Sequence, residues 1–122
     1  MKTLLADDND EIRAALRLLL EELAEGDVLE AGDLGQALAA LGRTSVDVIL
    51  LDWELPRGGY PGGITAEFVR ESKQRAPGCR VIAMSGRPES RGESLGAGCE
   101  AFVSKNDPPD RLLALLGVGR EL

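Results

Sequence analysis

Five side chains that could carry out phosphoryl-transfer chemistry follow short apolar runs of the sequence: Asp7, Asp8, Asp52, Ser85 and Lys105. Three carboxylates brought together repel one another unless a cation neutralises them. Oxygen ligands with positions left for water suit Mg²⁺, which also accepts a phosphate oxygen. A lysine ammonium and a serine hydroxyl could hold the transferred group, because this reaction depends mainly on positioning and charge neutralisation.

Each of these residues also has an ordinary structural interpretation. An aspartate after a strand often forms a turn or caps a helix, as Asp7 and Asp8 could do for a helix that follows Asn9. Lys105 alone could be a solvated surface lysine, and Ser85 a turn residue. The functional interpretation therefore depends on elements that bring all of them to one place.

Short runs rich in Val, Ile and Leu alternate with helical patterns along the chain. The apolar runs predict strands at residues 3–6, 28–31, 46–51, 80–84 and 101–104. The run at 46–51 is nearly continuous, which is typical of a parallel strand covered on both faces. Helical spacing predicts helices at 12–23, 34–41, 64–72, 89–95 and 109–116, the last with Asp107 as its N-cap.

Strands that alternate regularly with helices indicate a parallel sheet with helices on both faces. A chain of 122 residues is too short for a barrel, which needs about 250. We predict an α/β fold with a doubly wound five-stranded parallel sheet, as one domain over residues 1–122 with no output domain in this chain. Such sheets bind ligands beyond the carboxyl ends of their strands, where the polar side chains above would meet.

The composition argues against several classes of protein. Asp and Glu number 21 and Lys and Arg 14, a net charge of −7 that does not suit direct nucleic-acid binding. With no His and two Cys, a structural zinc site is not expected, and we interpret Cys79 and Cys99 as reduced core thiols. No signal peptide or run of about 20 apolar residues is present, so we expect a cytoplasmic protein without membrane insertion.

Four segments together resemble the receiver domains of two-component response regulators, including the single-domain chemotaxis-type regulators. Residues 4–9 look like the acidic pair after the first strand, and residues 48–56 like the phosphoacceptor segment with its downstream proline. Residues 81–86 look like the strand with the switch hydroxyl, and residues 96–105 like the fifth-strand signature. The resemblance implies a flavodoxin-like (βα)5 fold with strand order 2-1-3-4-5.

The resemblance also implies a role for each acidic residue. Asp52 would accept a phosphoryl group from a phosphohistidine of a sensor histidine kinase or a histidine phosphotransfer protein. Asp8, Asp52 and the backbone carbonyl of Glu54 would hold Mg²⁺, with Asp7 acting through water. The chain would be a regulatory phosphoacceptor rather than a metabolic enzyme, with self-phosphorylation and self-dephosphorylation chemistry of its own.

The remaining implied roles concern the output of the switch. Ser85 and Lys105 would contact the acyl phosphate, and Phe102 would change its burial when Ser85 moves. A downstream effector protein would bind the fourth helix, fifth strand and fifth helix. The receiver would act as a monomer or as a phosphorylation-linked dimer.

Two departures from the family pattern concern loops. Residues 57–63 form a longer, Gly-rich segment after Pro56, either a mobile surface loop or a partner-specific loop with Tyr60 as a contact. The usual proline after the lysine is replaced by Asn106. A cis bond before Asn106 would cost about 3 kcal/mol, so we predict that the Lys105–Asn106 bond is trans.

A third departure and two rival functions remain open. Glu54 and Arg87 could pair across the site and hinder the water that hydrolyses the phosphate. A degenerate receiver would act only as a phosphorylation-independent interaction module, which the intact site residues argue against. A phosphatase of the haloacid dehalogenase type needs a second Asp two residues after its nucleophile, where this chain has Glu54.

Overall fold

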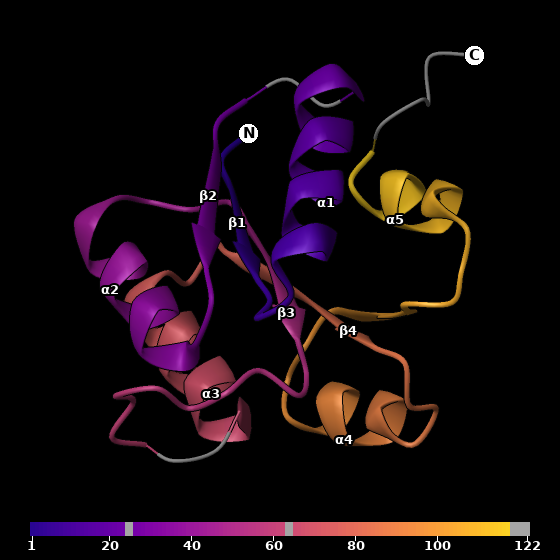
Figure 1. The fold of residues 1–122 in the computed structure, drawn as a ribbon. Helices are drawn as coiled ribbons and strands as arrows, with labels where there is room; N and C mark the ends of the chain where they lie inside the picture. Colours follow the sequence, from indigo (N-terminus) through magenta and orange to yellow (C-terminus); the bar gives the residue numbers. More distant parts are fainter. Residues whose placement is uncertain (24–25, 63–64, 118–122) are drawn as a thin grey trace.

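The computed structural model describes residues 1–23, 26–62 and 65–117, apart from the side chain of Leu23 (Figure 1). Strands and helices alternate as β1 Thr3–Ala6, α1 Asp10–Leu23, β2 Val28–Ala31, α2 Leu34–Arg43, β3 Val48–Asp52, α3 Thr65–Arg75, β4 Arg80–Ser85, α4 Ser90–Gly96, β5 Ala101–Ser104 and α5 Pro109–Leu115. All neighbouring strands pair in parallel, in the order β2-β1-β3-β4-β5. The predicted doubly wound, flavodoxin-like sheet is therefore confirmed.

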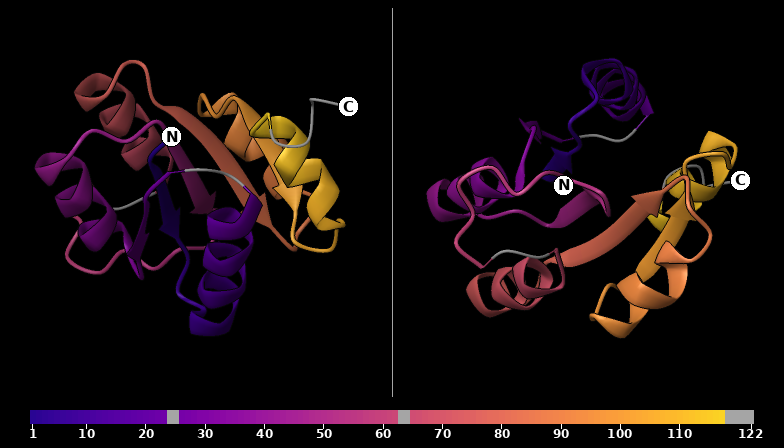
Figure 2. Two further views of the ribbon diagram at one scale, coloured as in Figure 1. Left: turned by 90° about the horizontal axis from the view of Figure 1, so that it is seen from above. Right: turned by 60° about the horizontal axis from the view of Figure 1, so that its bottom comes forward.

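Alternate strand residues fill two separate cores, because successive side chains of a strand point to opposite faces of the sheet. On one face Leu5 and Val103 pack with Leu20 of α1 and with side chains of α5. On the other face Leu4 and Phe102 belong to a second core, which also includes side chains of α2 and α3. Figure 2 shows α1 and α5 on one side of the sheet and α2, α3 and α4 on the other.

Two predicted strand boundaries are corrected by the pairing of the sheet. β3 begins at Val48 and includes Asp52, which pairs with Met84 on β4. β4 in turn includes Ser85, which pairs with Ser104 on β5. The two polar residues are thus the last residues of their strands, and backbone pairing to a neighbouring strand holds each of them in place.

The starts of two helices, α5 and α3, were predicted from the sequence. The predicted N-cap of α5 is wrong, since Pro108 is the capping residue and Asp107 Oδ2 instead accepts a hydrogen bond from the Ser104 N–H at 3.3 Å. Pro109 occupies the first turn of α5, where its missing N–H costs nothing. The predicted start of the third helix at Ile64 lies outside the described residues.

The Gly-rich loop after β3 is anchored to α2 through its described residues, 57–62. The Leu34 N–H at the start of α2 donates to the carbonyl of Pro56 at 2.9 Å. Gly58 has φ +59°, and a Cβ there would clash with the carboxylate of Asp33, the N-cap of α2. The loop therefore forms part of the helix cap, which a mobile surface loop would not.

Tyr60 is the central side chain of this loop, and it is buried, with 2% exposed. Its ring meets that of Phe68 edge to face, with centroids 5.8 Å apart, and its hydroxyl donates to Glu71 Oε1 at 2.9 Å. The hypothesis that Tyr60 is a partner contact is therefore wrong. The ring is large and apolar, and burying it against α3 removes it from water.

Three further expectations concern single residues and the membrane. Cys79 and Cys99 are free and buried as predicted, and burial raises their pKa values to about 11 and about 12. The Lys105–Asn106 bond is trans, which confirms the prediction. Within the described ranges, no helix combines the length and apolar character needed to cross a membrane.

Candidate functional site

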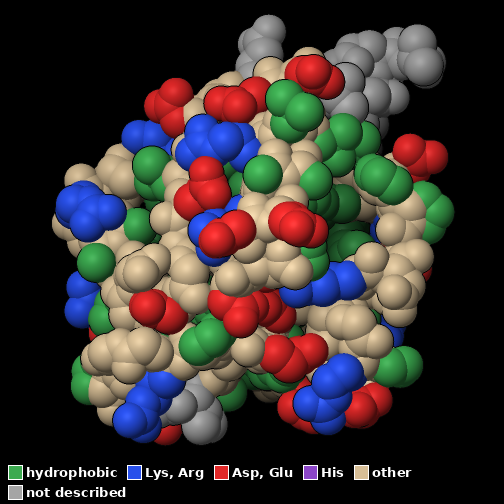
Figure 3. Space-filling view, viewed as in Figure 1, with side chains coloured by type: hydrophobic (Ala, Val, Ile, Leu, Met, Phe, Trp, Pro, Cys, Tyr) green, Lys and Arg blue, Asp and Glu red, His purple; other side chains and the backbone are tan. Residues whose placement is uncertain are grey.

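Three carboxylates meet at the carboxyl end of the sheet. Asp7 and Asp8 follow β1, and Asp52 ends the neighbouring strand β3. Each offers one oxygen, and these oxygens all lie within 4.8 Å of one another. Asp7 and Asp52 are buried whereas Asp8 is exposed, and Figure 3 shows acidic side chains gathered near the end of β3.

Lys105, one residue after β5, reaches this cluster with its ammonium group. Its Nζ lies 2.7 Å from Asp7 Oδ2 and 3.5 Å from Asp52 Oδ1. Asp7 Oδ2 is buried and, among the described residues, has this ion-pair contact but no hydrogen bond. One ammonium beside three carboxylates leaves an excess of negative charge that a bound cation would neutralise.

The pKa values of the site reflect this arrangement. Burial, followed by the nearby charge of Asp7, raises the pKa of Asp52 to about 6, although Lys105 opposes the shift. Burial would lower the pKa of Lys105, but its contacts with Asp7 and Asp52 outweigh burial and raise it. Asp52 is thus a partly dehydrated carboxylate in a negatively charged environment, and Lys105 remains charged beside it.

This donor set fits a hard divalent cation. Carboxylate oxygens from Asp7, Asp8 and Asp52 are close enough to share one ion. Asp7 Oδ2 is buried and, among the described residues, its polar contact is the Lys105 ammonium, so the oxygen keeps capacity to accept a cation or its bound water. The exposure of Asp8 leaves one side open to water and to a phosphoryl oxygen.

Asn9, and not either aspartate, caps α1. Its Oδ1 accepts from the N–H groups of Glu11 and Ile12 at 2.9 and 3.1 Å, while Asp7 Oδ1 accepts from the Asn9 N–H at 2.9 Å. The alternative in which Asp7 and Asp8 serve only as helix caps is therefore wrong. The cap instead leaves Asp7 Oδ2 and the Asp8 carboxylate directed to the cluster.

Arg13 of α1 fixes the backbone of the acidic loop, a role that we did not predict. Its Nη1 donates to the carbonyl of Asp7 at 2.5 Å, and its Nε pairs with Glu30 Oε1 on β2 at 3.0 Å. The spacing in the sequence contains no signal for this contact, because Arg13 lies beside the apolar stripe of α1 like any surface arginine. Arg13 thus connects the loop that carries Asp7 and Asp8 to β2.

Ser85 ends β4, the strand that pairs with β3 on the side away from β1. Ser85 is 1% exposed, and its hydroxyl donates to Glu54 Oε1 at 2.6 Å. The predicted pairing of Glu54 with Arg87 is wrong, because Arg87 Nε instead pairs with Glu89 Oε1 at 3.0 Å, two residues further along the same loop. Glu54 is therefore committed to a hydroxyl and not to an arginine.

Trp53 connects the end of β3 to α4. Its indole Nε1–H donates to Glu93 Oε2 on α4 at 3.2 Å, and its carbonyl accepts from Thr65 Oγ1 at 3.3 Å. Phe102 on β5, the expected switch aromatic, is buried, with 6% exposed. Trp53 is the only tryptophan of the chain, so its fluorescence reports on the immediate neighbourhood of Asp52.

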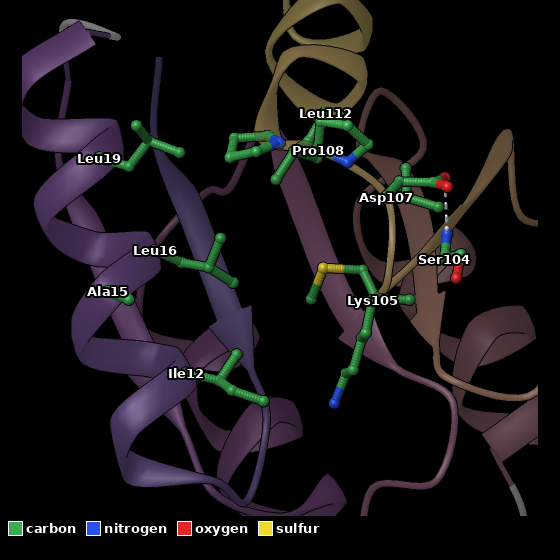
Figure 4. A pocket seen from close by; sticks show the side chains of 12 residues that line it. Ile12, Ala15, Leu16, Leu19, Ser104, Lys105, Asp107, Pro108 and Leu112 are labelled. Carbon is green, nitrogen blue, oxygen red and sulfur yellow. Dashed lines mark hydrogen bonds between the residues drawn. The ribbon is translucent and has the colours of Figure 1, made fainter.

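An apolar groove of about 360 Å³ runs beside the site, between α1 and α5. Figure 4 shows Ile12, Leu16 and Leu19 of α1 on one side and Lys105 and Leu112 on the other. The hollow and its hydrophobic lining are also visible in Figure 3. Since Lys105 contacts Asp7 and Asp52, the groove opens directly beside the acidic cluster.

Comparison with known proteins identifies this arrangement. Residues 3–117 match the family described as the response regulator receiver domain. The chain belongs to this family. Receiver domains are regulatory modules of two-component signalling and are not metabolic enzymes, which confirms the family and the broad class expected from the sequence.

Curated receiver-containing relatives are longer than this chain. The phosphate regulon transcriptional regulatory protein PhoB of Escherichia coli (strain K12) is 31% identical over 117 residues, which are 93% of this chain and 48% of PhoB. The DNA-binding transcriptional activator DevR/DosR of Mycobacterium tuberculosis (strain ATCC 25618 / H37Rv) is 32% identical over 109 residues, 87% of this chain and 48% of DevR/DosR. The chain spans about half the length of these relatives.

Solved receiver structures show the same fold. The chemotaxis response regulator CheY4 of Vibrio cholerae superimposes with a TM-score of 0.79 at 26% identity, over 95% of both chains. A CheY-like receiver domain protein from Methanospirillum hungatei JF-1 superimposes with a TM-score of 0.80 at 25% identity, over 95% of this chain and 90% of the other. The receiver fold therefore extends over nearly the whole chain.

Proposed function

We propose that this chain is an active phosphoacceptor receiver, switched by phosphorylation of Asp52. The phosphoryl group comes from the phosphohistidine of a sensor histidine kinase or a histidine phosphotransfer protein. The observation that carries the proposal is the placement of the buried Asp52 carboxylate among Asp7, Asp8 and the Lys105 ammonium. A degenerate receiver would not need to retain this set, which is costly to bury.

The chain's own residues account for most of the chemistry. An Asp52 oxygen forms the new O–P bond as the P–N bond of the phosphohistidine breaks. The electron pair of the broken P–N bond stays with the imidazole nitrogen. Lys105 lies 3.5 Å from Asp52 and neutralises part of the charge that collects there. Asp7, Asp8, Asp52 and the Glu54 carbonyl would hold Mg²⁺, which supplies further positive charge for the phosphoryl oxygens.

The same geometry supports a proposal for the partner surfaces. A phosphohistidine donor approaches from the open side of Asp8, where the groove between α1 and α5 offers apolar contact area beside Lys105. A downstream effector binds α4, β5 and α5, which the Trp53–Glu93 hydrogen bond connects to the phosphorylation site. With these partners, we propose that the protein acts in the cytoplasm, as a monomer or as a phosphorylation-linked dimer.

Mg²⁺ will change the fluorescence of Trp53, and beryllofluoride, a phosphoryl analogue, will change it again. Asp8→Asn will weaken Mg²⁺ binding at least about tenfold, because it removes one charged ligand. Glu11→Gln is the matched control, since it removes an exposed acidic charge nearby without removing a ligand. A native protein without either fluorescence change would instead be a degenerate receiver.

Arg13→Ala will weaken Mg²⁺ binding by about tenfold, as expected when a partner that orients a metal ligand is lost. The loss follows because Arg13 holds the Asp7 carbonyl. Arg17→Ala is the control, since Arg17 pairs with the same Glu30 but donates to the Val28 carbonyl instead. Fluorescence titration of both variants with Mg²⁺ provides the test. If Arg13→Ala and Arg17→Ala bind Mg²⁺ with equal affinity, Arg13 stabilises the fold without positioning Asp7.

A further inference from the structure

All the hydrogen-bonding capacity of the Ser85 hydroxyl is already in use. A hydroxyl has one proton to donate and two lone pairs that accept. Ser85 Oγ donates to Glu54 Oε1 at 2.6 Å and accepts from the Arg87 N–H at 2.9 Å. The Ser90 hydroxyl, 3.1 Å away, can then only donate to Ser85. A phosphoryl group on Asp52 could therefore gain this hydroxyl as a donor only by displacing Glu54.

Glu54 spans the distance between the phosphoacceptor and Ser85. Its backbone N–H donates to Asp52 Oδ1 at 3.0 Å, while its side chain reaches Ser85 at the end of β4. The residue is exposed, and its side chain borders an open cleft of about 390 Å³ with Thr65 and Arg87. The carboxylate therefore has space and water to enter when it leaves the hydroxyl.

We propose that Glu54 is a gate on the switch hydroxyl: its carboxylate occupies Ser85 until a phosphoryl group on Asp52 displaces it. This inference rests on the proposed phosphorylation of Asp52 and adds its regulation. A phosphoryl group carries a charge of about −1.5 to −2. Like charges repel strongly where water is partly excluded, so the charge expels the Glu54 carboxylate. The freed hydroxyl then donates to the phosphoryl oxygen.

The gate is also connected to α4, where the output begins. Ser90, which hydrogen-bonds Ser85, is the first residue of α4, and Trp53, beside Glu54, bonds Glu93 in the same helix. Movement of Ser85 toward the phosphoryl group withdraws it from Ser90. Release of Glu54 and loosening of the first turn of α4 are therefore one event, and the gate sets how readily phosphorylation reaches the output surface.

Removing the gate will make the site easier to switch. In saturating Mg²⁺, Glu54→Ala will bind beryllofluoride about tenfold more tightly than the native protein. The reason is that the Glu54 carboxylate no longer competes with the analogue for the Ser85 hydroxyl, to which it makes a charge-assisted hydrogen bond. Glu54→Gln, which keeps a neutral acceptor, will lie between the two. Glu89→Gln removes a nearby exposed charge that does not contact Ser85 and will bind as the native protein does. Calorimetry and Trp53 fluorescence measure the affinities.

A double-mutant cycle separates the gate from simple charge repulsion. In a Ser85→Ala background, Glu54→Ala will change the beryllofluoride affinity by less than about twofold, because no hydroxyl remains to compete for. If Glu54→Ala tightens beryllofluoride binding equally in both backgrounds, or does not tighten it in the native background, the gate is overturned. Binding of the analogue to the native protein would still support the phosphoacceptor function. Absence of binding to the native protein would overturn the proposed function and the gate together.

Discussion

Asp52→Asn will abolish phosphorylation of this chain, reducing incorporation from acetyl phosphate or a phosphohistidine donor to background. The amide that replaces the carboxylate lacks the negative charge that makes the oxygen a nucleophile. The substitution also removes one of the three carboxylates whose oxygens lie within 4.8 Å of one another. Phosphate-affinity gel electrophoresis in the presence of Mg²⁺ measures incorporation, and Trp53 fluorescence will no longer respond to the donor.

The control for this variant lies on the same strand. Asp47 directly precedes β3, at the end away from Asp52, and its exposed carboxylate accepts from the Lys2 N–H at 2.7 Å. Asp47→Asn will incorporate phosphate as the native chain does. Labelling of the Asp52→Asn protein at the native rate would contradict the assignment, since another side chain would then be the acceptor.

The same substitution has an expected effect on stability. Without Mg²⁺, the buried Asp52 carboxylate is repelled by Asp7, and the single ammonium of Lys105 compensates only part of this repulsion. Asp52→Asn will therefore raise the unfolding temperature of the metal-free protein. Adding Mg²⁺ will stabilise the native chain more than the variant, because the variant has lost one ligand and one repelling charge.

Most of what could be predicted about the site follows from the rule that parallel sheets bind ligands beyond the carboxyl ends of their strands. The alternation of apolar runs and helical patterns predicts a parallel sheet, whose strands bring their carboxyl ends to one edge, whereas the strand order was implied by the family resemblance. Asp7 and Asp52 fit this rule, since Asp7 directly follows β1 and Asp52 ends the neighbouring strand β3. Lys105 follows in the same way from β5, although β4 separates it from β3 in the sheet.

Which side chains pair within that edge could not be predicted. A hydrogen bond requires its atoms within about 3 Å and a favourable angle, whereas spacing in the sequence determines only the edge and the face. Glu54 and Arg87 stand at equivalent offsets after their strands, yet Glu54 bonds Ser85 and Arg87 pairs with Glu89. The loops that decide this choice have no periodic pattern from which their path could be derived.

The conformation of the Gly-rich loop could not be predicted for a related reason. Glycine-rich composition is typical of exposed segments, but composition does not reveal that Gly58 needs a positive φ or that Tyr60 turns inward. A single aromatic residue within a Gly-rich segment was the available signal, because nearby small residues allow a large ring to reach the core. A Cβ on Gly62 would clash with the Tyr60 ring, which is consistent with this interpretation.

Tyr60→Ala will destabilise the fold by about 3–5 kcal/mol, the range measured when a buried aromatic side chain is truncated. The variant loses the packing against Phe68 and leaves a cavity at the anchor between the loop and α3. Tyr60→Phe keeps the ring and loses only the hydrogen bond to Glu71, so it will cost about 1 kcal/mol. Urea unfolding followed by circular dichroism measures both free energies. Equal, small losses would show that the loop is not part of the core and would return Tyr60 to the surface role that its neighbours in the sequence suggest.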